Sequence, residues 1–320
     1  MDACSAAYRL YCTNSAEETD AKHKLNNGNH EVECFNDKSD TGTRKLETCK
    51  KNPGHVNFIP VTSFQLGNLP VQCRDKRLVS YIRFLSRLVV HLSARFTSVN
   101  RPEHYPCFNS RGTSGLRNAT GFTWIPGEIE EIPCPIKECP YSQKEHTVYG
   151  YLRVMTNKHV VYDLGEALNT VGRLYFDSTD QYSSIQCVGL DYSTEDSDVA
   201  HLRCVTHDAA LLPLVKGQQE KAYRTYKSIA PETWRKCQGL CVVISHPHGL
   251  AKAITVGAHV MFEVTRNNSR AHYYNAATCP GSSGAPVLYV CQREEGAHPM
   301  WVPAVHSYHC RVTNFNCAFK

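Results

Sequence analysis

The hydrophobic and polar positions along the chain mostly follow the period of β-strands, with a few helical stretches. Leu78, Ile82, Leu85 and Val89 recur at helical spacing, which predicts an amphipathic helix that ends near residue 88. The following stretch, VHLSARFTSV, alternates between apolar and polar residues and predicts a half-buried strand. A weaker helical pattern lies at residues 218–226.

After residue 99 the chain is a succession of short apolar runs broken by turns. They include VYGYLRVMT, SIQCVGLDY, LCVVISHP, AITVGAHVMFEV and APVLYV. Such spacing predicts a mainly all-β fold, a barrel or a sandwich, over residues 75–320. Residues 1–74 are polar and rich in Asn, Lys, Glu and Cys, which indicates a loosely structured region or a small Cys-containing module. His30, Cys34, Cys49 and His55 in this region offer zinc ligands, but their spacing matches no compact zinc finger.

The composition narrows the classes of function. The chain has 320 residues, 42% of them hydrophobic, and a net charge of +5 without a basic block, which argues against a nucleic-acid partner. No segment approaches the roughly 20 apolar residues of a membrane span. The N-terminus lacks the pattern of a secretory signal, so we expect a cytoplasmic protein, or a secreted one if a leader has been removed. The 16 cysteines are then expected as thiols, some of them with a metal, and no pattern indicates the oligomeric state.

The stretch TCPGSSGAPVL offers a candidate nucleophile. Gly281 lies two residues before Ser283, a spacing that lets the two backbone N–H groups converge, although a flexible Gly/Ser turn has the same composition. His159 ends a strand-like run, and Asp198 opens another. The order is His, Asp, Ser, with intervals of 39 and 85 residues, so one barrel can supply the first two residues and a second barrel the third.

These segments together resemble the chymotrypsin-like (trypsin-fold) serine proteases, and among them the HtrA-like and glutamyl-endopeptidase branch. TNKHVV, DSDVAHL, CPGSSGAPV and ISHPHGLAKAITVG are similar to the motifs of that family. The resemblance implies that His159 is the general base, Asp198 the orienting acid and Ser283 the nucleophile, with Gly281 and Ser283 as oxyanion donors. It also implies two six-stranded antiparallel barrels, approximately residues 88–205 and 206–318, and a serine endopeptidase acting on proteins or peptides.

The chain departs from the family at two places. Ser282 stands where secreted trypsins have the Asp that pairs with a new N-terminus, so activation by that route is not expected. Cys279 and Cys310 stand where many members have a disulfide beside the substrate pocket. In a reducing cell we expect these two cysteines to be free thiols.

The resemblance also identifies residues of the pocket for the P1 side chain, the residue before the cleaved bond. Ala277 replaces the carboxylate that selects Lys or Arg in trypsins. Thr278, and His306 before Ser307, resemble the pocket of glutamyl endopeptidases and viral chymotrypsin-like proteases. A hydroxyl and an imidazole N–H can both donate to the side chain of Glu or Gln, which predicts that preference. The alternative is that His306 only caps buried backbone.

Cysteine and histidine clusters offer a weaker, structural prediction. Cys134, Cys139 and His146 have zinc-compatible spacing, with Cys107 as a fourth ligand, and a second candidate is Cys237 and Cys241 with His246 and His248. Buried thiols are the alternative, and no cofactor or catalytic metal is expected. Two other functions remain open: a catalytically silent binding or scaffold protein on the same fold, and a zinc-dependent interaction protein acting through its Cys/His segments.

Overall fold

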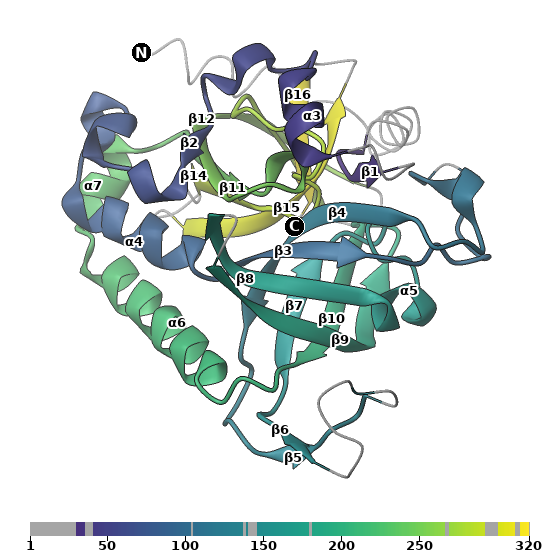
Figure 1. Cartoon of the computed structure of the whole chain (residues 1–320). Coiled ribbons are helices and arrows are strands. Elements are labelled where there is room, and N and C mark those ends of the chain that lie inside the picture. Colours follow the sequence, from purple (N-terminus) through teal and green to yellow (C-terminus); the bar gives the residue numbers. More distant parts are fainter. Residues whose placement is uncertain are drawn as a thin grey trace.

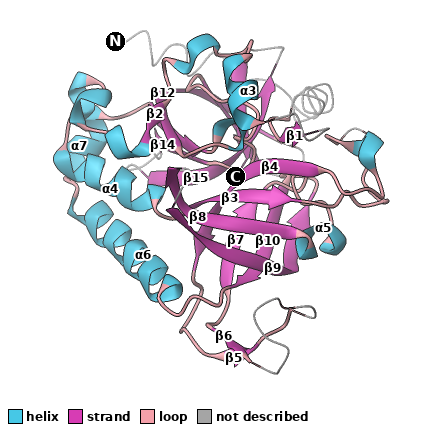
Figure 2. Cartoon of the chain, in the orientation of Figure 1, coloured by secondary structure: helices cyan, strands magenta, loops and turns pink. Residues whose placement is uncertain are grey.

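The structure, a computed structural model, describes residues 30–35, 41–103, 105–136, 139, 146–178, 181–265, 269–291, 300–310 and 314–319. Two β-barrels lie against each other, and helices cover one side of the pair (Figures 1 and 2). Residues 1–74 were predicted as a loosely structured region or a small Cys-containing module, and residues 1–29 and 36–40 of it fall outside the described residues.

The first barrel contains the predicted His and Asp segments. Its strands are β3 (Val89–Ala94), β4 (Leu116–Trp124), β7 (Leu152–Thr156), β8 (Thr170–Ser178), β9 (Gln181–Thr194) and β10 (Val199–Val205). They pair antiparallel in the order β4-β3-β8-β9-β10-β7, and the β4–β7 pairing closes the ring. Alternate residues of β8 and β10 point into the barrel, so their apolar side chains form its core.

The second barrel contains the predicted nucleophile segment. Its strands are β11 (Leu240–Ser245), β12 (Ala253–Val264), β13 (Arg270–Tyr274), β14 (Pro286–Cys291), β15 (Met300–Cys310) and β16 (Phe315–Phe319). They pair in the order β11-β14-β15-β16-β13-β12, and the β11–β12 pairing closes the ring. The fold is therefore the trypsin-like double barrel that the sequence predicted.

The helices lie outside the barrels. α4 (Lys76–Ser86) confirms the predicted amphipathic helix, and the Asp75 carboxylate caps it by accepting from the N–H of Arg77 at 2.6 Å. The weak helical pattern at residues 218–226 belongs to the longer α6 (Leu211–Ser228), which packs beside α4 (Figure 1). The remaining short elements are α3 (Gly42–Glu47), α5 (Leu164–Leu168), α7 (Pro231–Lys236), the 3-10 helices η2 (Pro53–His55), η3 (Val61–Ser63), η4 (Leu66–Asn68), η5 (Val71–Cys73), η6 (Phe108–Ser110) and η7 (Pro247–Gly249), and the strand pair β5 (Ile132–Pro133) and β6 (Thr147–Val148).

The described part of residues 1–74 packs onto both barrels. β1 (Glu33–Phe35) pairs antiparallel with β4, and β2 (Ile59–Pro60) pairs antiparallel with β12. Each barrel thereby gains a seventh strand from the N-terminal region. The division of the chain at residue 74 stays a prediction.

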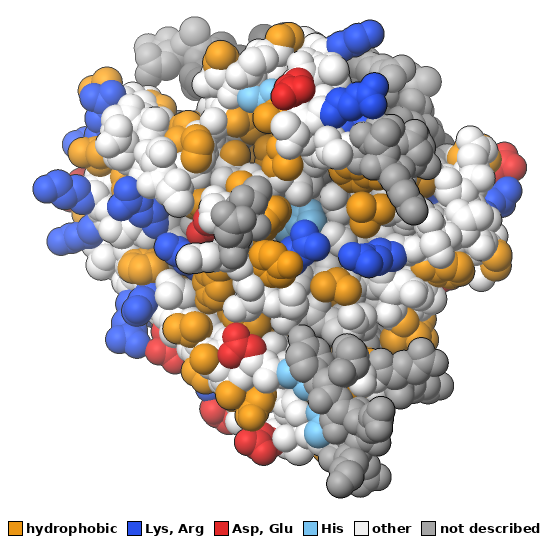
Figure 3. Space-filling view, viewed as in Figure 1, with side chains coloured by type: hydrophobic (Ala, Val, Ile, Leu, Met, Phe, Trp, Pro, Cys, Tyr) orange, Lys and Arg blue, Asp and Glu red, His pale blue; other side chains and the backbone are white. Residues whose placement is uncertain are grey.

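Lys and Arg side chains are unevenly distributed over the face shown in Figure 3. On the face of Figure 3, Lys and Arg side chains gather at the left edge, where Figure 1 places α4, α6 and α7. Among the described residues, no helix is long and apolar enough to cross a membrane.

Candidate active site

The structure brings together the three residues that the sequence proposed as a triad. His159 follows β7, Asp198 precedes β10, and Ser283 lies in the loop before β14. His159 Nδ1 lies 2.6 Å from an Asp198 carboxylate oxygen, and His159 Nε2 lies 2.7 Å from Ser283 Oγ. All three side chains are buried. The arrangement allows a proton to move from the serine to the histidine while the carboxylate orients the ring.

Asp198 is stabilised as an anion. Its carboxylate accepts from the backbone N–H of His159 at 3.0 Å and from the hydroxyl of Ser307 at 2.5 Å. Burial raises the pKa of Asp198, but the charge and hydrogen bonds of His159 and the hydroxyl of Ser307 outweigh burial and lower it to about 2. Ser307 therefore orients the acid, in addition to its predicted place in the pocket wall.

A buried ion pair fixes the backbone of the His159 segment. The Arg101 guanidinium donates to the carbonyl of His159 at 2.7 Å and pairs with Glu166 at 2.6 Å. Arg117 lies 3.0 Å from the same carboxylate, and all three side chains are almost fully buried. The sequence analysis missed this cluster, because isolated Arg and Glu residues in a chain with 20% charged residues do not indicate burial.

The nucleophile loop requires glycine at residue 281. Gly281 has φ of 96°, and a Cβ there would lie 2.4 Å from the carbonyl of His246. Thr120 of the first barrel holds the loop: its hydroxyl donates to the carbonyl of Gly281 at 2.8 Å, and its N–H to that of Ser283 at 2.9 Å. The Ser282 hydroxyl donates to Ser245 instead, so Ser283 alone faces His159.

The two predicted oxyanion donors converge on one carbonyl oxygen. The N–H groups of Gly281 and Ser283 donate to the carbonyl of Glu31, at 2.7 and 3.0 Å. An oxyanion hole needs two donors about 2.7–3.1 Å from one oxygen, so the backbone geometry is suited to that role. The acceptor, the carbonyl of Glu31, belongs to the N-terminal region of the same chain. The sequence did not predict that this region enters the candidate site.

The Glu31 carboxylate enters the predicted P1 pocket. His306 Nε2 lies 2.8 Å from one carboxylate oxygen, and Lys51 forms an ion pair with the other. Lys51 also donates to the hydroxyl of Thr278 and to Asn316, each at 3.0 Å. Thr278 therefore positions the lysine.

The pocket is electrostatically suited to a carboxylate. Burial raises the pKa of Glu31, but the Lys51 charge and the hydrogen bond from His306 outweigh burial and place it well below its usual value. Burial lowers the pKa of His306, which favours a neutral ring. Tyr274 has a pKa raised well above its usual value by burial, and its hydroxyl lies 2.5 Å from His306 Nδ1. A phenol that donates to Nδ1 leaves the hydrogen of His306 on Nε2, facing Glu31.

Ala277, the other predicted pocket residue, adds no charge. Its carbonyl accepts from the hydroxyl of Thr255 at 2.8 Å, which fixes the backbone beside Thr278. The sequence analysis missed Lys51 and Tyr274 as residues of the pocket. Lys51 is far from Thr278 in the sequence. Tyr274 follows two other aromatic residues of β13, His272 and Tyr273, and nothing in the sequence distinguishes it from them.

The cysteines differ from the predictions in two respects. A disulfide joins Cys107 to Cys34, so these two cysteines are not the expected thiols, and Cys107 is not a fourth ligand for Cys134, Cys139 and His146. His207 takes that place, with Nε2 at 3.5 Å from the Cys134 sulfur and 3.3 Å from that of Cys139. No disulfide joins Cys279 and Cys310, which agrees with the expected thiols.

The second difference in the cysteines concerns the other candidate zinc residues. Cys34 is removed from the N-terminal set by its disulfide, whereas Cys49 and His55 meet His248 and Cys279 in one cluster. His248 is thereby separated from its predicted partners, since Cys237 and Cys241 are not in this group.

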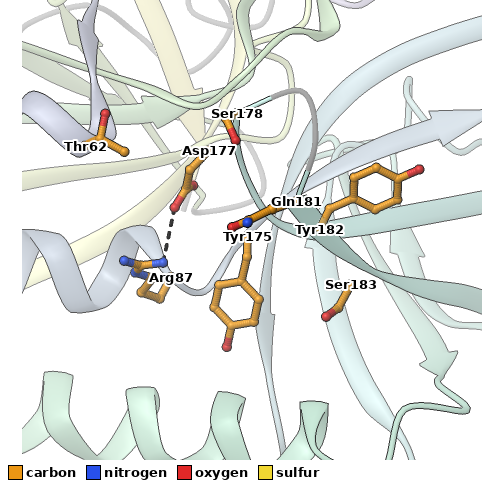
Figure 4. Close-up of a pocket in the computed structure, with 8 residues that line it drawn as sticks. All are labelled: Thr62, Arg87, Tyr175, Asp177, Ser178, Gln181, Tyr182 and Ser183. Carbon is orange, nitrogen blue, oxygen red and sulfur yellow. Dashed lines mark hydrogen bonds and ion pairs between the residues drawn. The ribbon is translucent and has the colours of Figure 1, made fainter.

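A surface groove lies apart from the triad, between the start of β9, the end of β8 and the end of α4 (Figure 4). An ion pair between Arg87 and Asp177, 3.2 Å long, crosses it. Its lining residues are Thr62, Arg87, Tyr175, Asp177, Ser178, Gln181, Tyr182 and Ser183. None of the predicted site residues lines the groove.

Comparisons with known proteins found similar crystal structures and one matching family profile. The crystal structures that align with the chain include the active form of the Rv3671c protease from M. tuberculosis, at 16% identity over 77% of this chain and 81% of that chain (TM-score 0.37). They also include the inactive form of Rv3671c protease, at 15% identity over 79% of this chain and 93% of that chain (TM-score 0.39). No curated protein sequence matches. The profile of the trypsin-like peptidase domain matches residues 145–293, a range that includes His159, Asp198 and Ser283.

Proposed function

We propose that the protein is a serine endopeptidase that uses Ser283, His159 and Asp198. The observation that supports this best is the hydrogen-bonded series from Asp198 through His159 to Ser283, with distances of 2.6 and 2.7 Å. Ser283 attacks a peptide carbonyl while His159 accepts its proton, and the N–H groups of Gly281 and Ser283 stabilise the oxyanion. His159 then protonates the leaving amine, and water hydrolyses the acyl-enzyme.

We further propose that the enzyme cleaves after Glu in preference to Gln. The pocket presents the Lys51 ammonium and the Nε2–H of His306 to the side chain. A cation beside the pocket favours a carboxylate over a neutral amide, because the amide leaves the lysine without an opposite charge. The position of the Glu31 carboxylate beside Lys51 and His306 supports this preference.

Labelling with a fluorophosphonate tests the chemistry. In the full chain carrying Glu31→Lys, which places a second cation beside Lys51 and so should empty the pocket, we expect Ser283 to be labelled. Adding Ser283→Ala should abolish labelling and peptide hydrolysis, whereas adding Ser282→Ala should retain both. A peptide library varied at P1 should give Glu first and Gln second. Equal labelling with and without Ser283 would refute the triad, and a P1 Leu or Arg profile would refute the pocket assignment.

A further inference from the structure

Residues 30–35 lie through the candidate active site as an extended peptide. His30 forms an antiparallel bridge with Tyr308 of β15, in the second barrel. From Glu33 to Phe35 the chain pairs antiparallel with β4 of the first barrel, with Glu33 opposite Asn118. The segment therefore crosses from one barrel to the other at Glu31–Val32, directly over the triad.

The atoms of Glu31 are placed as the reaction requires. Its carbonyl oxygen accepts from both N–H groups of the oxyanion hole, and its side chain occupies the P1 pocket. His30 stacks on the ring of His159, with centroids 3.9 Å apart. Glu31, Val32 and Glu33 are 4%, 6% and 5% exposed, so the segment is buried on both sides of the bond. Backbone pairing, pocket and oxyanion hole all select the same peptide group.

We propose that the chain is its own substrate and that Ser283 cleaves the Glu31–Val32 bond within the same molecule. This inference rests on the proposed function. The Ser283 oxygen bonds to the Glu31 carbonyl carbon as its proton passes to His159 Nε2. The C–N bond then breaks and His159 delivers that proton to the nitrogen of Val32. One water molecule hydrolyses the ester, which forms a new C-terminal α-carboxylate on Glu31 and restores the Ser283 hydroxyl.

Contacts of the described residues hold the segment on both sides of the bond. After the bond, β1 pairs with β4, and the Cys34–Cys107 disulfide ties the next residues to the first barrel. Before the bond, His30 bridges Tyr308 and stacks on the ring of His159. Intramolecular presentation of this kind raises the effective concentration of the bond, so cleavage does not require a second molecule. Cleavage leaves residues 1–31 without a covalent link and so opens the P1 pocket to other substrates.

The test compares full-length proteins made in cell-free translation, by intact mass and N-terminal sequencing. We expect the wild type to lose residues 1–31 and to start at Val32, at a rate independent of dilution. Ser283→Ala and Glu31→Lys should stay intact. Glu47→Lys, an equal charge change on an exposed residue of α3, should be processed like the wild type.

Three outcomes would overturn the proposal. If the wild type stays intact while Glu31→Lys hydrolyses P1-Glu peptides, the enzyme is real and the segment is an inhibitor. Processing that slows in proportion to dilution would show cleavage between molecules. If neither the wild type nor Glu31→Lys cleaves peptides or labels with fluorophosphonate, the proposed function itself fails.

A separate observation concerns metal binding by two Cys₂His₂ clusters. In the first cluster, the sulfurs of Cys49 and Cys279 are 3.6 Å apart, Cys279 Sγ is 3.3 Å from His55 Nε2, and the Nε2 atoms of His55 and His248 are 3.2 Å apart. In the second cluster, Cys139 Sγ is 3.2 Å from His146 Nε2, which is 3.0 Å from His207 Nε2. Tetrahedral Zn²⁺ with Cys₂His₂ ligands places the ligand atoms about 3.3–3.8 Å apart.

We infer that each cluster binds one structural zinc ion. In the first cluster the Glu33 carboxylate lies 2.7 Å from His248 Nδ1, which leaves Nε2 for the metal, as carboxylates commonly do for zinc-bound histidines. That zinc would join the segment containing Lys51 to the loop that precedes Gly281. It therefore supports the P1 pocket without touching the substrate.

Metal analysis of the full chain, purified under reducing conditions, tests this inference. We expect two zinc ions per chain, and one in each of His55→Ala and His207→Ala, whereas the control His201→Ala, on β10, should retain both. Replacement by Co²⁺ should give the visible absorption of tetrahedral thiolate sites in the wild type, independently of any variant. A metal-free wild type without that absorption, or a Cys49–Cys279 disulfide found by mass spectrometry, would overturn the inference.

Discussion

Replacing Tyr274 by Phe isolates the preference for Glu over Gln. The Tyr274 hydroxyl lies 2.5 Å from His306 Nδ1, and both side chains are fully buried. Without the hydroxyl, His306 can place its hydrogen on Nδ1 and present a lone pair to the P1 side chain. A carboxylate cannot bind that form, whereas the Gln amide can donate its NH₂ to it. The loss should therefore fall on Glu substrates.

The expected size of the effect follows from the single hydrogen bond removed. A buried neutral hydrogen bond contributes about 0.5–1.5 kcal/mol. Because the bond also fixes the hydrogen on Nε2, we expect the upper end for Glu, ~1.4 kcal/mol, which is about a tenfold loss of kcat/KM. For Gln we expect a loss of roughly threefold or less, since either form of the ring offers a partner.

The assay measures kcat/KM for two peptides that differ only in P1 Glu or Gln, in the full chain with Glu31→Lys so that the pocket is open. Tyr273→Phe is the matched control: Tyr273 is the neighbouring residue, also buried, and its hydroxyl donates to Glu263 at 3.1 Å, away from the pocket. Equal losses for both peptides, or a Glu loss no larger than in Tyr273→Phe, would refute the assignment of Tyr274.

Three further predictions concern the support of the triad. Glu166→Gln leaves the guanidinium groups of Arg101 and Arg117 without an anion, and the free energy of unfolding in urea should fall by about 3–5 kcal/mol; a change below about 1 kcal/mol would contradict it. Ser307→Ala removes one donor to Asp198, and kcat/KM should fall about tenfold with an unchanged Glu/Gln ratio; a changed ratio would instead place Ser307 in recognition. The Asp198 pKa is lowered from 3.8 to about 2, so its contribution to stability, about 2 kcal/mol, is present above pH ~4 and lost as the pH falls towards 2. In Asp198→Asn the urea stability should lack that part of the pH dependence, and an unchanged slope would argue against it.

The strands and the three residues that meet at the candidate site were predictable because their information is local. Alternation identifies β12 over its full length, and the motifs around His159, Asp198 and Ser283 each occupy a few consecutive residues. Once those motifs were recognised, the double barrel and the approximate place of the site followed.

The contacts of the N-terminal region were not predictable in this way. Lys51 meets Thr278 from 227 residues away, and no periodicity or spacing connects them. His207 lies 68 residues from Cys139, outside any compact motif. Nothing in the sequence distinguishes Cys107 from the other cysteines that were proposed as zinc ligands. A polar segment with little apolar pattern suggests a loose region, yet backbone pairing and charge place residues 30–35 in the cleft.

The bonds from Thr120 to the nucleophile loop limit how the molecule can open. Because Thr120 holds the carbonyls of Gly281 and Ser283 across the barrel interface, a hinge motion between the barrels would disrupt the proposed oxyanion hole while admitting a substrate. Entry of a protein chain therefore requires Glu31 to leave the cleft, while the two barrels stay in place as a rigid frame. The amide of Thr120 should accordingly exchange with deuterium as slowly as the barrel core, even when the cleft is empty.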